Sequence, residues 1–503
     1  MKQLYALFFS LLFVSFLSGQ PNLRVPAKAK DRIRLTKLDM TYERIEKGTT
    51  FDIIGYQATQ GTSIINYRIE IDGETYITSG RNVSEDIEID YKQASLQDLW
   101  ELHYIDSEGL AQAVKHGRDP MLRAEVEQEY RELEQGLELY EDPFLLDYLN
   151  QVLLRVFPGE VPERQAANLQ VLLFNGSEPW TFAFSNGKIY LSTGLLATLN
   201  SEAELMAILA TEVAHIYFDH SVANYRMQEI REARARFWTG LLTVAALAAE
   251  TAVAVDAAER GSYDLIDYQF FGEFTESVFL LSTEVAYSIL NRLGMEYTIA
   301  QQQEADQAAK RVLQWHGMGE NALSSALSRI DDYYKSTREY VLNQGQTPFA
   351  NIKKRISDLG GDPAFATTAL DANYMQRCAT LMSMSAWQEY REGELDISQR
   401  LVDRLVDNKL AVVDDQVLRS LLLRRTSLDN GHLRKALIWL DEAEKSARSV
   451  PVELYLERSV LHYRLGNMAE TKNALVKYRE DLLKLQPLQE KRLRWAEQML
   501  ERL

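Results

Sequence analysis

Residues 205–220 read LMAILATEVAHIYFDH, and this stretch decides how the rest of the chain is interpreted. Just before it, Ser201 is followed three residues later by Glu204, which is the pattern of a helix capping box. Apolar side chains then recur at the spacing of one helix face, namely Leu205, Ile208, Leu209, Val213 and Ile216. The stretch therefore predicts a buried helix that begins near Asn200 or Ser201.

The end of this helix carries Thr-Glu-Val-Ala-His, which differs by one residue from the zinc-binding motif His-Glu-x-x-His. In that motif the two histidines lie on the same helix face and bind the metal, and the glutamate activates a zinc-bound water. Glu212 and His215 keep two of the three positions. Thr211 stands where the first histidine would be, so the sequence predicts a metal-site motif with one ligand changed.

Length and composition limit the possible functions. The chain has 503 residues, which predicts two to four domains. Its formal net charge of −18 argues against a surface that tracks phosphates, so we expect no nucleic-acid partner. Residues 1–20 consist of Lys2, an apolar run and a small Ser-Gly pair, the pattern of a secretory signal peptide. Because Cys378 is the only cysteine, no intramolecular disulfide can form, and export to a bacterial periplasm or envelope is favoured.

The remaining segments predict three folded parts after the signal peptide. Residues 21–115 alternate apolar and polar side chains, which predicts a β-rich module with a hairpin turn at Asp72-Gly73, and the strand-like pattern runs to about Tyr104. Residues 119–390 combine helical patterns with strand signals at 169–174 and 188–192. The fold class is therefore mainly α with smaller β parts.

The segment from Phe237 to Ala249 is apolar except for threonine. Thirteen residues are too few to span a bilayer as a helix. The segment is therefore predicted to be a buried helix, and a flap that touches the membrane surface remains the alternative.

Residues 395–503 are helical throughout in pattern. A series of small and apolar residues recurs after 35 positions, with Gly431, Ala436, Leu440 and Ala443 repeated as Gly466, Thr471, Leu475 and Tyr478. This spacing is typical of tetratricopeptide helix pairs, and a generic α-solenoid is the alternative. Such arrays bind peptides or partner proteins on a concave surface.

Five motifs in order resemble one family: residues 190–196 (YLSTGLL), Glu204-Leu205, Glu212-x-x-His215, His220 and Glu304-Ala305-Asp306. It comprises the HtpX-like and BepA-like zinc metallopeptidases, with the prenyl-protein (CAAX) peptidases. The resemblance covers roughly residues 140–359 and implies a zincin-like domain. The helical tail is similar in arrangement to the BepA-like branch, which implies a role in envelope protein quality control that combines proteolysis with chaperone-like handling of clients.

The same resemblance implies which residues would form the zinc site. The family's three ligands correspond to Thr211, His215 and Gln302, the general base to Glu212, and the residue that supports the first histidine to Asp306. A later family histidine corresponds to Thr347, before Pro348. A threonine hydroxyl and a glutamine amide are poor substitutes for imidazole and carboxylate. Zinc is therefore expected from the family but not expected to bind here.

Other side chains are not expected to rebuild the site. On a continuous helix, His220 would lie about 500° around from His215 and point elsewhere. Asp219 would lie one turn beyond the site, and Glu304 roughly 200° from Gln302. Structural roles are then expected for the retained residues: Glu212 as a half-buried carboxylate bonded to Thr211 or His215, His215 as a core histidine, and Asp306 as a hydrogen-bond acceptor between helices.

Three functional hypotheses follow. The preferred one is an exported pseudopeptidase that binds protein or peptide clients without cleaving them. The second is an active zinc metalloendopeptidase with non-standard ligands. The third is a scaffold protein that acts through its β-rich module and helical repeats, with the central domain as a spacer.

Overall fold

The structure is a computed structural model. It describes residues 23–503 except for 38, 40, 60–63, 79–85, most of 117–136, 158–168, 224–296, 320, 338–350, 362–368 and 486. The predicted signal peptide, the segment from Phe237 to Ala249 and the Thr347-Pro348 pair lie outside the described residues. Within the described ones, no helix has both the length and the apolar content needed to cross a bilayer.

The N-terminal part is a seven-stranded antiparallel sheet with strand order β3-β2-β6-β5-β4-β1-β7. Its side chains alternate between buried and exposed, as the sequence predicts. Asp72 and Gly73 both have positive φ and form the predicted hairpin turn between β5 and β6. The strands are β1 (Val25–Ala29), β2 (Ile33–Lys37), β3 (Tyr42–Ile45), β4 (Thr50–Ala58), β5 (Ile65–Ile71), β6 (Glu74–Thr78) and β7 (Ile87–Ile89).

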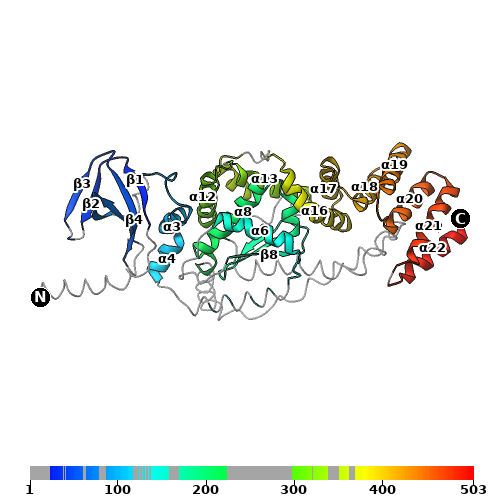
Figure 1. The fold of residues 1–503 in the computed structure, drawn as a ribbon, viewed down its shortest axis with the longest axis horizontal. Coiled ribbons are helices and arrows are strands. Elements are labelled where there is room, and N and C mark those ends of the chain that lie inside the picture. Colours follow the sequence, from blue (N-terminus) through cyan, green and yellow to red (C-terminus); the bar gives the residue numbers. More distant parts are fainter. Residues whose placement is uncertain are drawn as a thin grey trace, which may run out of the picture.

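Two helices, α3 (Leu96–Asp106) and α4 (Glu108–His116), follow the sheet, so the strand-like interpretation of residues up to Tyr104 is wrong. The reason is local: Ser95 and Asp98 form a capping box that starts α3. Trp100 is completely buried and packs against Phe157 and Tyr217 of the central domain. These helices therefore connect the sheet to the rest of the protein, as Figure 1 shows.

The central domain surrounds the organising helix, α8 (Glu202–Tyr217), which lies in the middle of the molecule in Figure 1. Ser201 caps α8 through the Glu204 amide, and every residue from Glu204 to Tyr217 is buried. Around it lie α6 (Pro143–Val156), the sheet β8 (Gln170–Phe174), β9 (Thr181–Ala183) and β10 (Lys188–Ser192), and then α7 (Thr193–Thr198), α12 (Ile299–Trp315), α13 (Ala322–Ser336), α15 (Ile352–Asp358) and α16 (Ala372–Glu392).

The small sheet has the order β8-β10-β9, with β8 parallel and β9 antiparallel to β10. The sequence predicts β8 and β10 and misses β9, which has only three residues. As an edge strand, β9 lies against α8.

Gly194, in the first turn of α7, allows this helix to lie against the loop before β9. A Cβ at position 194 would be 1.7 Å from the Ser177 carbonyl oxygen, a separation that real Cβ atoms do not reach. We expect Gly194→Ala to destabilise the central domain by about 1–3 kcal/mol, because well-packed interiors do not absorb an added methyl group. Urea unfolding measures this loss. Gly319→Ala is the control, since its nearest neighbouring atom would be 3.8 Å away, and equal losses in both variants would contradict the prediction.

The C-terminal part is helical from α17 (Leu395–Asp407) onward, and the helices succeed one another towards the C-terminus in Figure 1. They are α18 (Val413–Thr426), α19 (Asn430–Ser446), α20 (Val452–Arg464), α21 (Met468–Leu482) and α22 (Glu490–Arg502). Of the recurring residues, the six that follow the glycines are all buried in α19 and α21. Ion pairs join these helices from inside: Arg424 to Glu457 at 2.8 Å and Arg492 to Glu453 at 3.1 Å.

Candidate functional site

His215, the retained ligand position, lies in the last turn of α8 and is 2% exposed. Its Nδ1 is 2.9 Å from Nδ1 of His220. The ring of Tyr297 stacks on the imidazole with centroids 3.5 Å apart, and Gln302 of α12 lies beside it. Burial, together with the nearby His220 and Arg355, lowers the pKa of His215 well below its ordinary range. His215 is therefore a neutral, enclosed histidine.

The prediction that His220 points away from the site is wrong. It assumed a continuous helix, but α8 ends at Tyr217, and Asp219 takes a left-handed conformation with φ of 56°. This turn brings His220 back against His215 and leaves Asp219 beyond the helix. Nε2 of His220 also lies 2.9 Å from Oε2 of Glu304 on α12, so two residues that sequence geometry excluded are next to the site.

The two contacts of His220 constrain the tautomers. If a neutral His220 donates from Nε2 to Glu304, its Nδ1 accepts from Nδ1 of His215, and Nε2 of His215 is then an acceptor. Oε1 of Gln302, which lies beside His215, has no hydrogen-bond partner among the described residues.

Glu212, the position of the family's general base, is buried rather than half-buried. No hydrogen bond joins it to Thr211 or His215 in the described part of the chain, and its Oε2 and the nearby Thr181 hydroxyl of β9 both have no partner there. Burial raises the pKa of Glu212 to about 7, and the nearby Thr181 hydroxyl and the charge of Arg355 oppose this rise. The Thr211 hydroxyl donates to the Ala207 carbonyl within α8, at 3.1 Å.

Asp306 connects two helices. It accepts hydrogen bonds from Arg355 of α15, from Nε at 2.9 Å and from Nη2 at 2.7 Å. Both side chains are largely buried. Asp306 therefore contacts a cation and not the residue at the first ligand position.

These residues do not fit a catalytic zinc ion, which needs three protein ligands and one open position for water. The Thr211 hydroxyl is bonded within its own helix, and Nδ1 of His215 is hydrogen-bonded to His220. Over the residues that the structure describes, no group of three or more His, Cys, Asp and Glu side chains is placed to hold a metal. We derive no chemical step through a metal at this site.

Sequence reasoning misses Thr181 and Tyr297 as members of this site. Thr181 lies on the unpredicted strand β9, and Tyr297 comes just before the Thr298 cap of α12. The alternating run 181–183 is too short to predict a strand. The Thr298 and Gln301 pair is a capping-box signal from which the start of α12 could have been found.

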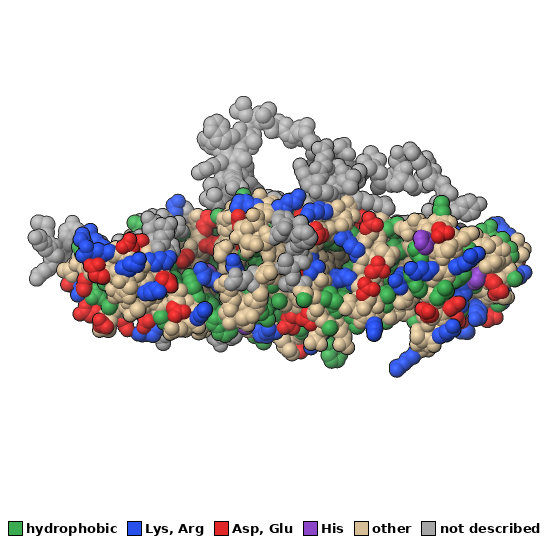
Figure 2. Space-filling model, turned by 90° about the horizontal axis from the view of Figure 1, so that it is seen from above, with side chains coloured by type: hydrophobic (Ala, Val, Ile, Leu, Met, Phe, Trp, Pro, Cys, Tyr) green, Lys and Arg blue, Asp and Glu red, His purple; other side chains and the backbone are tan. Residues whose placement is uncertain are grey.

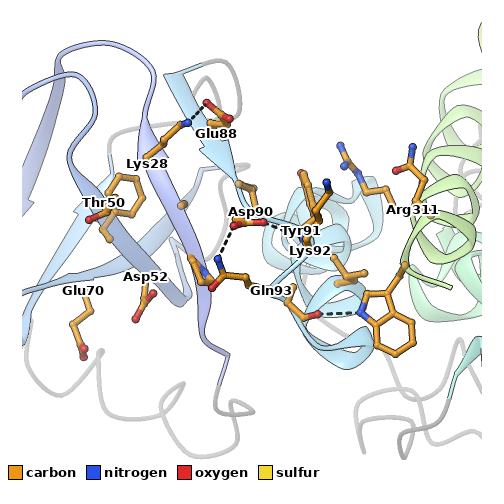
Figure 3. Close-up of a pocket in the computed structure, with 18 of the residues that line it drawn as sticks. Lys28, Thr50, Asp52, Glu70, Glu88, Asp90, Tyr91, Lys92, Gln93 and Arg311 are labelled. Atoms are coloured by element: carbon orange, nitrogen blue, oxygen red, sulfur yellow. Dashed lines mark hydrogen bonds and ion pairs between the residues drawn. The ribbon is translucent and has the colours of Figure 1, made fainter. Parts of the chain in front are cut away.

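A cleft of about 1500 Å³ lies between the N-terminal sheet and the C-terminal end of α12 (Figure 3). One wall carries Lys28, paired with Glu88, on the outer face of the sheet. At the other, the Arg311 guanidinium lies 3.6 Å above the Tyr91 ring, and Trp315 Nε1 donates to the Ala94 carbonyl at 3.0 Å. None of the residues predicted for the zinc site lines this cleft, so it is separate from the candidate site.

Comparison with known proteins identifies one family. Residues 147–377 match the family model for peptidase family M48, whose members depend on zinc. The chain is 28% identical over 154 residues to a putative beta-barrel assembly-enhancing protease of Vibrio cholerae, over 31% of this chain and 26% of that protein. It is 25% identical over 203 residues to the beta-barrel assembly-enhancing protease of Escherichia coli, over 40% and 36% of the two chains. The matches thus span only about a third of these relatives or less.

Proposed function

We propose that this chain, in which residues 147–377 belong to peptidase family M48, is an exported pseudopeptidase that binds protein or peptide clients without cleaving them. The main observation in support is that the residues at the zinc-ligand positions are changed. Thr211 and Gln302 replace two ligands, and the one retained ligand, His215, has its Nδ1 2.9 Å from Nδ1 of His220. Without a metal-bound water, Glu212 has no nucleophile to activate.

The edge strand β9 supports client binding in the central domain. An extended peptide can add to an exposed sheet edge through main-chain hydrogen bonds, and β9 is the edge strand beside α8. Phe182 and Ala183 of this strand are buried, so the strand is fixed against the centre of the domain. Binding at this edge requires no metal.

The helical C-terminal part supplies a second surface for clients. The pairing of α18 to α22 supports a tetratricopeptide-like array, which would present a surface to protein partners. Acidic and basic side chains are interspersed along the face of the molecule seen in Figure 2, which supports a protein partner rather than a nucleic acid. Together with the predicted signal peptide, the likeness to beta-barrel assembly-enhancing proteases supports a place in envelope protein quality control or assembly, in a bacterial periplasm.

One observation favours the alternative of an active zinc metalloendopeptidase. Glu212 is retained, and burial raises its pKa to about 7, which suits a general base. This alternative needs metal that the described residues are not arranged to hold.

The metal content of the purified protein distinguishes the pseudopeptidase from the active metalloendopeptidase. We expect the purified mature protein to contain no stoichiometric zinc by elemental analysis, and the double variant Thr211→His, Gln302→Glu to take up one zinc, because it restores the three-ligand set. One zinc per wild-type chain, with proteolysis that disappears in Glu212→Gln, would establish the alternative instead.

Client binding is tested with an unfolded outer-membrane β-barrel protein as the probe. We expect the metal-free wild type to suppress its aggregation, measured by light scattering, without producing fragments. Equal suppression by a chain that lacks residues 119–390 would instead support the scaffold hypothesis, in which the central domain is only a spacer.

A further inference from the structure

The carboxylate of Glu304 joins the N-terminal module to the candidate site. The backbone N–H of Glu108, the first residue of α4, donates to Oε1 of Glu304 at 2.9 Å. The other oxygen of Glu304 accepts from His220 at 2.9 Å. Glu304 therefore bonds at once to the module's second helix and to the histidine pair, and it lies on α12.

A chain of hydrogen bonds runs between α12 and α8. Starting from Glu304 of α12, it runs to His220 and then to His215 of α8, beside which Gln302 of α12 lies. A zinc ion with ligands from both helices would connect the same two elements. Here side chains make the connection directly.

Close packing accompanies this chain of hydrogen bonds at the end of α8. A Cβ at Gly109 of α4 would lie 1.7 Å from the Phe218 carbonyl oxygen, so α4 sits directly on the turn that places His220. Tyr217 donates a short hydrogen bond to Glu101 of α3. Farther along α12, Arg311 and Trp315 contact the segment that leads from the sheet to α3.

We propose that Glu304 and His220 form a metal-independent clamp that fastens α8 to α12 and both to the N-terminal module. This inference rests on the proposed function, because it takes the site to be metal-free. Hydrogen bonds to an ionised carboxylate are stronger than neutral ones, and a negative charge at the N-terminus of α4 is favourable for that helix. Glu304 is thus a positioning residue, and movement of the module is transmitted to His215.

The test combines thermal unfolding in EDTA with hydrogen exchange of residues 108–116. We expect Glu304→Ala and His220→Ala each to lower the Tm by about 3–8 °C, since each removes a charge-assisted hydrogen bond. Both should also speed exchange in α4, although His220 itself makes no hydrogen bond to that helix. The double variant should lower the Tm by less than the sum of the two single variants. Gln307→Ala, on the exposed side of α12, is the matched control.

The variant Glu304→Gln tests the hydrogen bonds of the clamp more specifically, because glutamine has the same size and shape as glutamate. The glutamine amide can donate to Nε2 of His220, whose Nδ1 then donates to His215, and the glutamine carbonyl oxygen still accepts from the Glu108 N–H. We expect this variant to keep a Tm within about 2 °C of the wild type. The clamp would be contradicted if the Tm losses of the two single variants added up in the double variant, or if His220→Ala left hydrogen exchange in α4 unchanged. Neither result would contradict the proposed function. A wild-type Tm that falls in EDTA would overturn the proposed function as well.

Discussion

Glu212→Gln should stabilise the protein at pH 8 by about 2–3 kcal/mol and flatten the pH dependence of its unfolding. Burial raises the pKa of Glu212 to about 7 in the folded chain, against an ordinary value near 4.5. Between these two pH values the folded state holds a proton that the unfolded state has lost. Stability therefore falls as the pH rises through this window, and above pH 7 the buried charge costs its full amount.

Denaturant unfolding at pH 5, 6, 7 and 8 measures this effect. The wild type should lose stability across the series relative to the variant, because a glutamine has no proton to lose. Glu141→Gln is the control, since Glu141 is exposed and its substitution should leave the pH profile unchanged. A variant no more stable than the wild type at pH 8 would contradict the prediction. In an active metallopeptidase the same substitution would abolish proteolysis, so one variant addresses both the electrostatics and the function.

Asp306→Ala should be the most damaging single substitution at the site, with a loss of about 3–5 kcal/mol. It leaves the guanidinium of Arg355, whose side chain is 13% exposed, without the carboxylate that accepts its two hydrogen bonds. A buried charge that has lost its partner retains the full cost of its desolvation.

Urea unfolding of three variants tests this explanation. The double variant Asp306→Leu, Arg355→Met should recover most of the loss, because a well-packed apolar pair replaces a buried ion pair at little cost. Lys354→Ala breaks the pair with Asp358 on the same helix, where both side chains are substantially exposed, and it should cost less than about 1 kcal/mol. If the double variant is no more stable than Asp306→Ala, the loss does not come from the unpaired arginine.

The sequence predicts the site's elements better than its contacts. Periodicity and the Ser201 cap predict α8 because both signals lie within one stretch of chain. The position of His220 depends on where that helix stops, and Asp219 is a non-glycine residue in a left-handed conformation, which no simple pattern indicates. The contact of Glu212 with Thr181 is between residues of different elements, and it is made only when the sheet packs on α8.

In the N-terminal module, too, the sequence predicts local elements better than the contacts between them. Alternation of apolar and polar residues predicts the strands correctly because one face of each is buried. In α3 the cap residues Ser95 and Asp98 mark a helix start, and these residues, rather than the alternation, should decide the interpretation. That Glu108 meets Glu304 could not be predicted, because it depends on how two separately folded parts dock.

Helix α20 connects the C-terminal helices, because it forms buried ion pairs with both α18 and α22. Glu453 and Glu457 lie one turn apart on it, and each takes an arginine from a different neighbour, Arg492 of α22 and Arg424 of α18. Both arginines are less than one-tenth exposed, so water cannot readily take over either contact. Separation of α22 from the other helices therefore requires the ion pair between α22 and α20 to break, and α20 is in turn paired with α18. The terminal helices α18, α20 and α22 therefore resist separation as one unit.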